Sequence, residues 1–301
     1  MLQKSYLGNK GRGPKLALGT YPYTYARVSV MRSFLLRKDE YHKLMKMNVN
    51  EIIGYLQNSQ YRKEIDELAV RYRGVELMEL ALNRNLANTW AKLKKISPPS
   101  LRVLISTYLL RVDIWNVKTL VRAKYTKLSP EQLPAMLLPS GFLNEKKLSE
   151  LMKKDSVEDV LKSIGFIDQS YFGLAIERFK ETKSVAEIEN ALDRFYYSVM
   201  EEFSGRLPDE GRLFREFLEL ETEVAAIMNV LRLKRANTPS KDIENFIIVP
   251  KKISALVKKM VSSQSAADAA KLLESSRLRA FVEAGVKEFI STGSLVTLEL
   301  D

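Results

Sequence analysis

An eight-residue segment of this chain recurs 113 residues further on, and both copies end long amphipathic segments. Residues 116–123 read NVKTLVRA and residues 229–236 read NVLRLKRA, so five of eight positions are identical. A chain built from copies of one helical unit is more often part of an assembly than an enzyme, because a catalytic site usually breaks internal symmetry.

A second element recurs three times. Residues 44–46 and 151–153 both read LMK, residues 256–258 read LVK, and successive copies stand 107 and 105 residues apart. Each copy lies in a predicted short helix that is followed by a polar turn and another short helix. This step is too long for tetratricopeptide or HEAT repeats, whose units have about 34 to 47 residues. We therefore expect three copies of one unit that contains several helices.

Apolar residues recur at the helical period along almost the whole chain. We expect helices over residues 24–38, 61–87, 100–125, 184–203 and 209–236. Ser97 is the expected N-cap of the third of these helices, and Ser184 with Glu187 forms a capping box at the fourth. Only residues 294–300 could be a strand.

The two longest segments each carry an apolar stripe with spacings of four and three residues, which we expect to face the core. The first stripe consists of Leu101, Ile105, Tyr108, Val112 and Trp115. The second stripe consists of Leu213, Phe217, Leu220, Val224, Ile227 and Leu231.

These patterns predict an all-α fold with three similar helical domains. The expected parts are a basic flexible tail over 1–20 and helical units over 21–125, 126–236 and 237–301. The third unit lacks the Asn…Arg-Ala ending of the other two. We expect that part of a helix is missing at the C-terminus, the alternative being that the third unit is a degenerate copy.

Composition limits the possible functions. The formal net charge of +11, from 48 Lys and Arg against 37 Asp and Glu, suits nucleic acid, an anionic membrane surface or an acidic protein, but also a merely solvated basic surface. The chain has no cysteine and one histidine, His42, which disfavours a metal site. No apolar run approaches the roughly 20 residues that span a bilayer.

Several local signals resemble sites but fail on inspection. The Gly- and Lys-rich residues 8–15 lack the Gly-Lys-Ser/Thr ending of a phosphate loop, so we expect a basic tail. His42 has only Asp39 as a nearby helical partner, and residues 291–294 read as a turn. The carboxylates of Glu216, Glu219, Glu221 and Glu223 share their helix with Arg212 and Arg215, which favours a solvated face over a titrating cluster.

Polar residues inside the repeated helices carry more information. Asp113 and Asn116 share one helix face in an otherwise apolar segment, and Asn229 is the second copy of Asn116. Buried polar groups need hydrogen-bond partners. These residues therefore form a candidate structural node, either between helices or protein chains or as a cap on a neighbouring helix of the same domain.

The same segments carry a family resemblance. Residues 23–28 (YTYARV), followed by Leu35 and Leu36, resemble the opening of the C subunit of A-type rotary ATPases, the relative of the d subunit of V-ATPases. Residues 108–124 resemble the central signature of that family, and residues 223–236 resemble its second occurrence. The resemblance covers nearly the whole chain.

The resemblance implies a pseudo-threefold funnel of three helical domains. In the family, this funnel sits on the membrane proteolipid ring, receives the central axle made by the D and F subunits, and binds no nucleotide. The chain would then be a non-catalytic component of the central stalk without cofactor or metal, peripheral at the cytoplasmic face of the cell membrane. It would couple axle and ring during proton- or sodium-driven ATP synthesis or ATP-driven ion pumping.

Two candidate faces follow from this implication. The candidate axle contacts are Arg27, Arg122 and Arg235, whose competing role is capping within a domain. The candidate ring or membrane contacts are Lys251, Lys252, Lys258 and Lys259.

Functions of other classes remain open. A helical nucleic-acid-binding or scaffold protein with a basic surface would bind random DNA with a steep salt dependence. A helical-bundle enzyme would use the carboxylates of residues 216–223 and show metal-dependent turnover, although no Glu-x-x-His pair is present to hold a di-metal centre.

Overall fold

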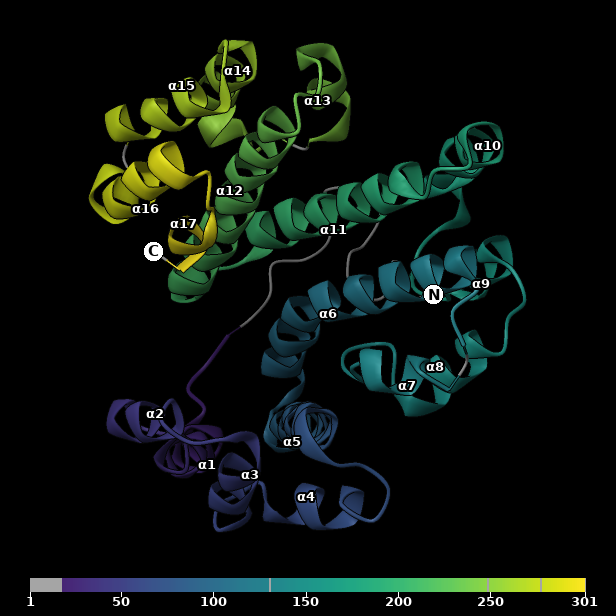
Figure 1. Cartoon of the computed structure of the whole chain (residues 1–301), viewed down its shortest axis with the longest axis vertical. Coiled ribbons are helices and arrows are strands. Elements are labelled where there is room, and N and C mark those ends of the chain that lie inside the picture. The colour runs from purple at the N-terminus through teal and green to yellow at the C-terminus, as the bar shows by residue number, and fades with distance from the viewer. Residues whose placement is uncertain (1–17, 130, 248, 277, 301) are drawn as a thin grey trace. The chain divides into compact units, whose positions relative to one another are not determined.

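The computed structural model describes residues 18–129, 131–247, 249–276 and 278–300. Every regular element within these residues is a helix, so the expected all-α class is confirmed (Figure 1). The earlier helices are α1 (Pro22–Ser33), α2 (Lys38–Leu44), α3 (Val49–Gln57), α4 (Arg62–Leu68), α5 (Gly74–Ile96), α6 (Pro99–Thr126), α7 (Leu133–Met136), α8 (Glu145–Met152), α9 (Val157–Ser163), α10 (Gly173–Thr182) and α11 (Ala186–Arg206). The later helices are α12 (Arg212–Arg235), α13 (Ser240–Phe246), α14 (Ser254–Ser262), α15 (Ala266–Lys271), α16 (Arg279–Thr292) and α17 (Val296–Leu300). Among the described residues, no helix combines the length and apolar character needed to cross a membrane.

The chain forms two compact units, Met1–Leu192 and Asp193–Asp301, and the division falls inside α11. In the first unit, α3, α4 and α5 pack around a small core of Leu56, Ile65, Leu77 and Ala81. Further along the same unit, α6 packs on α7 and α9. The expected division into three units at residues 125 and 236 remains a prediction.

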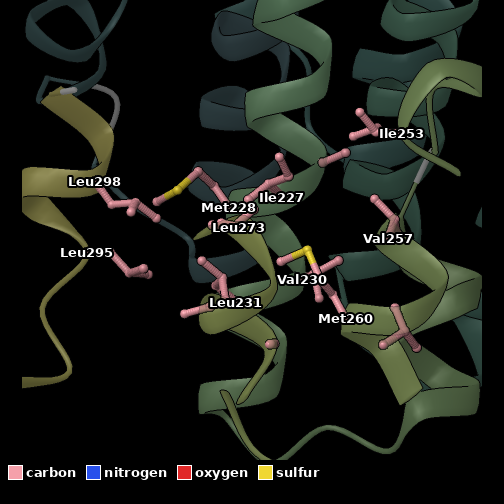
Figure 2. Packing of buried hydrophobic residues seen from close by; sticks show 14 of the residues in the cluster. Ile227, Met228, Val230, Leu231, Ile253, Val257, Met260, Leu273, Leu295 and Leu298 are labelled. Atoms are coloured by element: carbon pink, nitrogen blue, oxygen red, sulfur yellow. The ribbon is translucent and has the colours of Figure 1, made fainter. Parts of the chain in front are cut away.

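The second unit is built on the C-terminal half of α12. This half packs against α14 and α15, and side chains from these helices and from the last two helices form one apolar cluster (Figure 2). Val230, Leu231, Met260 and Leu273 in this cluster are completely buried. Burial of each such side chain contributes about 1.5–3 kcal/mol, so this cluster supplies much of the stability of the unit.

A pair of short helices recurs three times in the element order: α2–α3, α8–α9 and α14–α15. The second helix of each pair begins at a side-chain N-cap, and the caps are Asn48, Ser156 and Ser265. Each cap oxygen accepts the backbone N–H three residues later, at 3.1, 3.1 and 3.0 Å. Such a cap stabilises a helix start by about 1 kcal/mol, which explains why these short segments are helical.

The last two pairs are held in the same way by the long helix that precedes them. Lys124, near the end of α6, donates its Nζ to the carbonyl oxygen of Met152 at the end of α8, at 2.6 Å. Lys234, near the end of α12, donates to the carbonyl oxygen of Ser263 just after α14, also at 2.6 Å. A cation on these orphan carbonyls satisfies the negative end of the helix dipole.

Several expected helix boundaries are wrong. The predicted helix over 24–38 ends early, at Ser33, and α2 begins only at Lys38. The predicted helix over 61–87 is interrupted between the end of α4 at Leu68 and the start of α5 at Gly74, whose φ of 57° is left-handed. Ser97 is not an N-cap: its Oγ donates to the carbonyl oxygen of Leu93 at 2.7 Å and so closes the preceding helix, while Pro98 holds the cap position of α6.

The first predicted apolar stripe is misplaced, whereas the second is correct at Ile227 and Leu231, which are buried, and wrong at its earlier members. Trp115 in α6 is 48% exposed, and Leu213 in α12 is 75% exposed. In α6 the buried arc includes Leu104, Leu110 and Val117 instead, because the helix packs against neighbours on more than one side. In α12 the buried apolar residues lie mainly in the C-terminal half, where α14 and α15 pack.

The possible strand over 294–300 is a helix, α17. Leu295 and Leu298, three residues apart, are both buried, whereas Val296 between them is 62% exposed. Buried side chains three residues apart are typical of a helix. Leu298 lies directly against Gly285, where α17 packs on α16.

Candidate functional site

The carboxylate of Asp113 is a buried polar group of the first unit that is fully engaged in hydrogen bonds. Asp113 lies in the middle of α6 and is completely buried. Its Oδ1 accepts the Ser140 hydroxyl and the Leu143 backbone N–H, both at 3.0 Å, and its Oδ2 accepts the Phe142 N–H at 2.7 Å. One helix side chain therefore satisfies three donors of the loop that connects α7 to α8.

Asn116 holds the same loop one turn later. Its Oδ1 accepts the backbone N–H of Leu138 at 2.9 Å, and its Nδ2 donates to the carbonyl oxygen of Leu138 at 2.7 Å. The side-chain amide thus pairs with both backbone groups of one residue, as a neighbouring strand would. Asp113 and Asn116 together clamp residues 138–143 onto α6.

Lys94 completes the clamp from α5. Its Nζ donates to the carbonyl oxygen of Ser140 at 2.7 Å and to that of Gly141 at 3.3 Å. Burial raises the pKa of Asp113 to about 6, against the opposing effect of its hydrogen bonds and of the Lys94 charge. Burial likewise lowers the pKa of Lys94, while the nearby Asp113 charge works in the other direction. Every oxygen of the carboxylate is engaged in the loop, so the arrangement is suited to holding backbone in place.

The second copy of the repeated octet does not reproduce this clamp. Asn229 is half-buried in α12, and its side chain makes no hydrogen bond within the described part of the chain. Ala226 takes the position that Asp113 has in the first copy. The backbone pattern is repeated, but Asn229 does not hold a loop as Asn116 does.

Two of the three candidate arginines are engaged inside their own units. Arg122 binds Glu189 of α11 through two hydrogen bonds, Nε to Oε1 at 2.6 Å and Nη2 to Oε2 at 2.7 Å. Arg235 donates to the carbonyl oxygen of Gly293 at 2.6 Å, just after α16. Arg122 and Arg235 both lie at the ends of long helices, whereas Arg27 is an exposed residue in the middle of α1.

The four candidate lysines divide into two kinds. Lys251 pairs with Glu201 at 2.9 Å, and Lys252 pairs with Glu219. Lys258 and Lys259 are exposed on α14 and make no ion pair within the described residues. Of these four lysines, only the second pair offers cationic charge that no carboxylate of the described chain already balances.

The carboxylates of α12 lie in different surroundings. Glu216 faces Arg212 at 3.8 Å, and Glu219 faces Lys252, whereas Glu223 is 1% exposed. They do not converge on one point, and the described residues hold no group of three side chains suited to bind a metal ion. His42 is exposed on α2, and the Gly- and Lys-rich residues 8–15 lie outside the described residues.

Sequence reasoning missed the loop side of the clamp. Lys94, Ser140 and Gly141 carry it together with the two α6 residues. The only sequence signal is the Pro139-Ser140-Gly141 turn, and such turns are common on protein surfaces. Sequence reasoning also missed Lys124 and Lys234, whose side chains cap the ends of short helices, although both residues stand in or beside the repeated octets.

Comparison with known proteins identifies the family to which the chain belongs. The family model described as ATP synthase (C/AC39) subunit matches residues 24–301. The C subunit of the A-type ATP synthase of Methanosarcina acetivorans is 39% identical over 229 residues, which cover 76% of this chain and 62% of that protein. The proteins of the same name from Haloferax volcanii and Archaeoglobus fulgidus are 33% and 31% identical over 75% and 81% of this chain. The chain spans about three fifths of the length of the first of these relatives, 62%.

Proposed function

Because the chain belongs to the ATP synthase (C/AC39) subunit family, we propose that it is a non-catalytic component of the central stalk of an A-type ATP synthase. In this role it couples a rotating axle of the D and F subunits to the membrane proteolipid ring, in ATP synthesis or ion pumping. The observation that carries the proposal is the family match over residues 24–301. The relatives' shared name, which designates the C subunit of an A-type ATP synthase, agrees with it.

The repeated helix order supports a three-domain funnel as the working form. The pairs α2–α3, α8–α9 and α14–α15 recur at cap spacings of 108 and 109 residues. The long helices α6 and α12 each dock onto the pair that follows them. An adaptor between a rotating shaft and a ring gains from such a build, because each repeat presents the same kind of helix end to a central partner.

We assign the axle contact to the ends of the long helices, around Arg122 and Arg235. Both guanidinium groups also bind acceptors inside their units, and each is at least partly exposed, so a partner can share them. The ring contact falls to Lys258 and Lys259, since Lys251 and Lys252 are already paired with carboxylates. The protein is then peripheral at the cytoplasmic face of the membrane.

The proposal is tested by binding of a purified D–F pair from a related archaeal enzyme to the full chain. We expect a complex with the unaltered chain and weaker binding by the Arg122→Glu/Arg235→Glu variant. The matched control is Lys92→Glu/Lys180→Glu, which makes the same charge change at exposed sites on α5 and α10. No complex with D–F at all would contradict the proposed function.

Weaker D–F binding by a variant can come from unfolding of the chain or from loss of the binding contact itself, and these two causes must be separated. If Arg122→Glu/Arg235→Glu lowers the thermal midpoint while its folded fraction binds D–F as before, the two arginines are caps and the axle contact lies elsewhere. A neutral Arg122→Gln/Arg235→Gln variant gives a second measurement with less repulsion at Glu189.

A further inference from the structure

Helix α1 has an outward face that no described part of the chain covers. Tyr23, Val30 and Phe34 are 65%, 57% and 60% exposed, although large apolar side chains usually find a core. With Arg27 they follow a spacing of four, three and four residues, which places all four on one side of a helix. Thr24 lies away from this side and is buried: its hydroxyl donates to the carbonyl oxygen of Ile96 at 2.9 Å.

The charge around this face has one sign. From Pro22 to Lys38 the chain carries Arg27, Arg32, Arg37 and Lys38 and no acidic residue, and the first acidic residue of the whole chain is Asp39. Arg27 and Arg32 are exposed and make no ion pair within the described residues. An apolar face with unbalanced cations beside it therefore stands on the surface of the first unit.

We propose that this outward face of α1 binds the surface of an anionic phospholipid bilayer. Aromatic rings such as those of Tyr23 and Phe34 are favoured at the headgroup level, where one end of the side chain is apolar and the other is wet. Val30 between them adds apolar area that enters the headgroup–acyl boundary. Arginines extend their apolar stems along the interface and place the guanidinium at lipid phosphates, and each such charge contributes about fivefold in affinity.

Another exposed apolar stripe in the chain does not have this chemistry. Leu213, Phe217 and Leu220 on α12 are exposed to a similar degree. Glu216 and Glu219 stand on the same helix among them and pair with Arg212 and Lys252, so these two cations are already balanced and attract an anionic membrane less than the unpaired arginines of α1 do. Charge thus distinguishes α1 as the lipid-binding face and makes the α12 stripe a matched comparison. A single-stranded nucleic acid also favours arginines and aromatic rings, but it gains nothing from the aliphatic Val30 and Leu35.

This inference does not rest on the proposed rotary function. It concerns a helix remote in sequence from the proposed ring contacts, and it assigns Arg27 to lipid phosphate instead of the axle. Failure of vesicle binding would leave D–F binding untouched, and failure of D–F binding would leave vesicle binding untouched.

The test is flotation of the full 301-residue chain with vesicles of phosphatidylcholine alone or mixed with phosphatidylglycerol. We expect binding to the anionic vesicles that weakens with salt, and little binding to the neutral ones. Arg27→Gln/Arg32→Gln should lower the partition coefficient by roughly 30-fold, since each basic residue is worth about fivefold. Tyr23→Ser/Phe34→Ser should lower it as well. Lys92→Gln/Lys180→Gln removes the same charge from exposed sites on α5 and α10 and should leave binding unchanged.

A labelling experiment keeps the test valid even if an α1 variant folds poorly. The chain has no cysteine, so Val30→Cys and Leu213→Cys each provide a single site for an environment-sensitive dye. We expect the dye at position 30, and not at position 213, to report an apolar environment when anionic vesicles are added. Circular dichroism verifies that each variant keeps its helices.

Several results would overturn the proposal. They are absence of binding to anionic vesicles, equal binding to neutral vesicles, full binding by both α1 variants, or an equal loss in the Lys92→Gln/Lys180→Gln control. Binding of a single-stranded oligonucleotide that depends on α1, without vesicle binding, would assign the face to nucleic acid. A dimer in light scattering that dissociates in Phe34→Ser would show that a second copy covers the face.

Discussion

Gly141 lies directly against the carboxylate of Asp113, so close that a Cβ at position 141 would collide with Asp113 Oδ2. The same carboxylate accepts hydrogen bonds from Phe142 and Leu143, the two residues after this glycine. The loop thus passes over α6 at a separation that only glycine permits. Because the loop lies in direct contact with the carboxylate, one helix side chain can accept hydrogen bonds from two consecutive backbone N–H groups.

Replacement of Gly141 by alanine should destabilise the first unit. Asp113 Oδ2 and Cγ would have to move, and the hydrogen bonds to the loop would lengthen. We expect a loss of about 1–3 kcal/mol in the free energy of unfolding, measured by urea denaturation. Gly54→Ala in α3 is the control: no atom lies within 4 Å of its new Cβ, and alanine should stabilise that helix by about 0.5–1 kcal/mol. Equal stability of Gly141→Ala and the unaltered chain would disprove the tight contact.

The stability contribution of Asp113 should depend on pH. Its folded pKa is raised to about 6 from 3.8, so between these values the folded chain binds a proton that the unfolded chain does not. Stability relative to Asp113→Asn should therefore be greatest below pH 4 and decline as the pH rises through 6. The full difference is about 3 kcal/mol, from 1.36 kcal/mol per pKa unit. Denaturation of both proteins at a series of pH values measures it, and a constant difference would contradict the raised pKa.

Asn116→Asp should destabilise the chain more than Asn229→Asp. The carboxylate of the first variant keeps an acceptor for the Leu138 N–H but loses the donor to the Leu138 carbonyl oxygen and buries a charge. We expect a loss of at least about 2–3 kcal/mol near neutral pH, which is partly recovered in acid as the carboxyl becomes protonated. Asn229 is half-buried with no such partner among the described residues, so its replacement should cost much less. Similar thermal midpoints for the two variants would show that the clamp contributes little.

Lys124→Met and Lys234→Met should cost similar amounts of stability. Each leaves a helix-end carbonyl, of Met152 or of Ser263, without its cationic donor and keeps most of the apolar stem. We expect about 1–3 kcal/mol for each, because hydrogen bonds to charged groups exceed neutral ones. Lys92→Met, at an exposed position of α5, is the control and should change the thermal midpoint little. If only one of the two variants is destabilised, the two long helices do not hold their short pairs equivalently.

The clamp was only half predictable from the sequence. Asp113 and Asn116 are visible as candidates because two polar residues interrupt an apolar helix, and buried polar groups require partners. Their partners lie 22 to 30 residues further on, in a loop whose sequence resembles any surface turn. No local pattern encodes that distance, because the pairing depends on how α7 and α8 return to α6.

The burial of residues in the short helix pairs could not be predicted from the sequence either. Relative to their N-caps, Val157, Val160 and Leu161 occupy the same positions as Val49, Ile52 and Ile53 of the first pair. The former are at most 5% exposed, whereas the latter are only half-buried. The difference comes from the neighbours of each helix, because α9 packs closely on α6, whereas α3 shares the surface of α5 with α4.

The sequence alone therefore determined the helical class and the recurring order of short helices, because the helical period and turn signals act within a few residues. It could not determine which face of each helix is buried, as Trp115 and Leu213 demonstrate. Burial depends on which helix packs against which, and these contacts join residues far apart in the chain. Only the tertiary structure decided them, and with them the loop that Asp113 holds and the face that α1 leaves open.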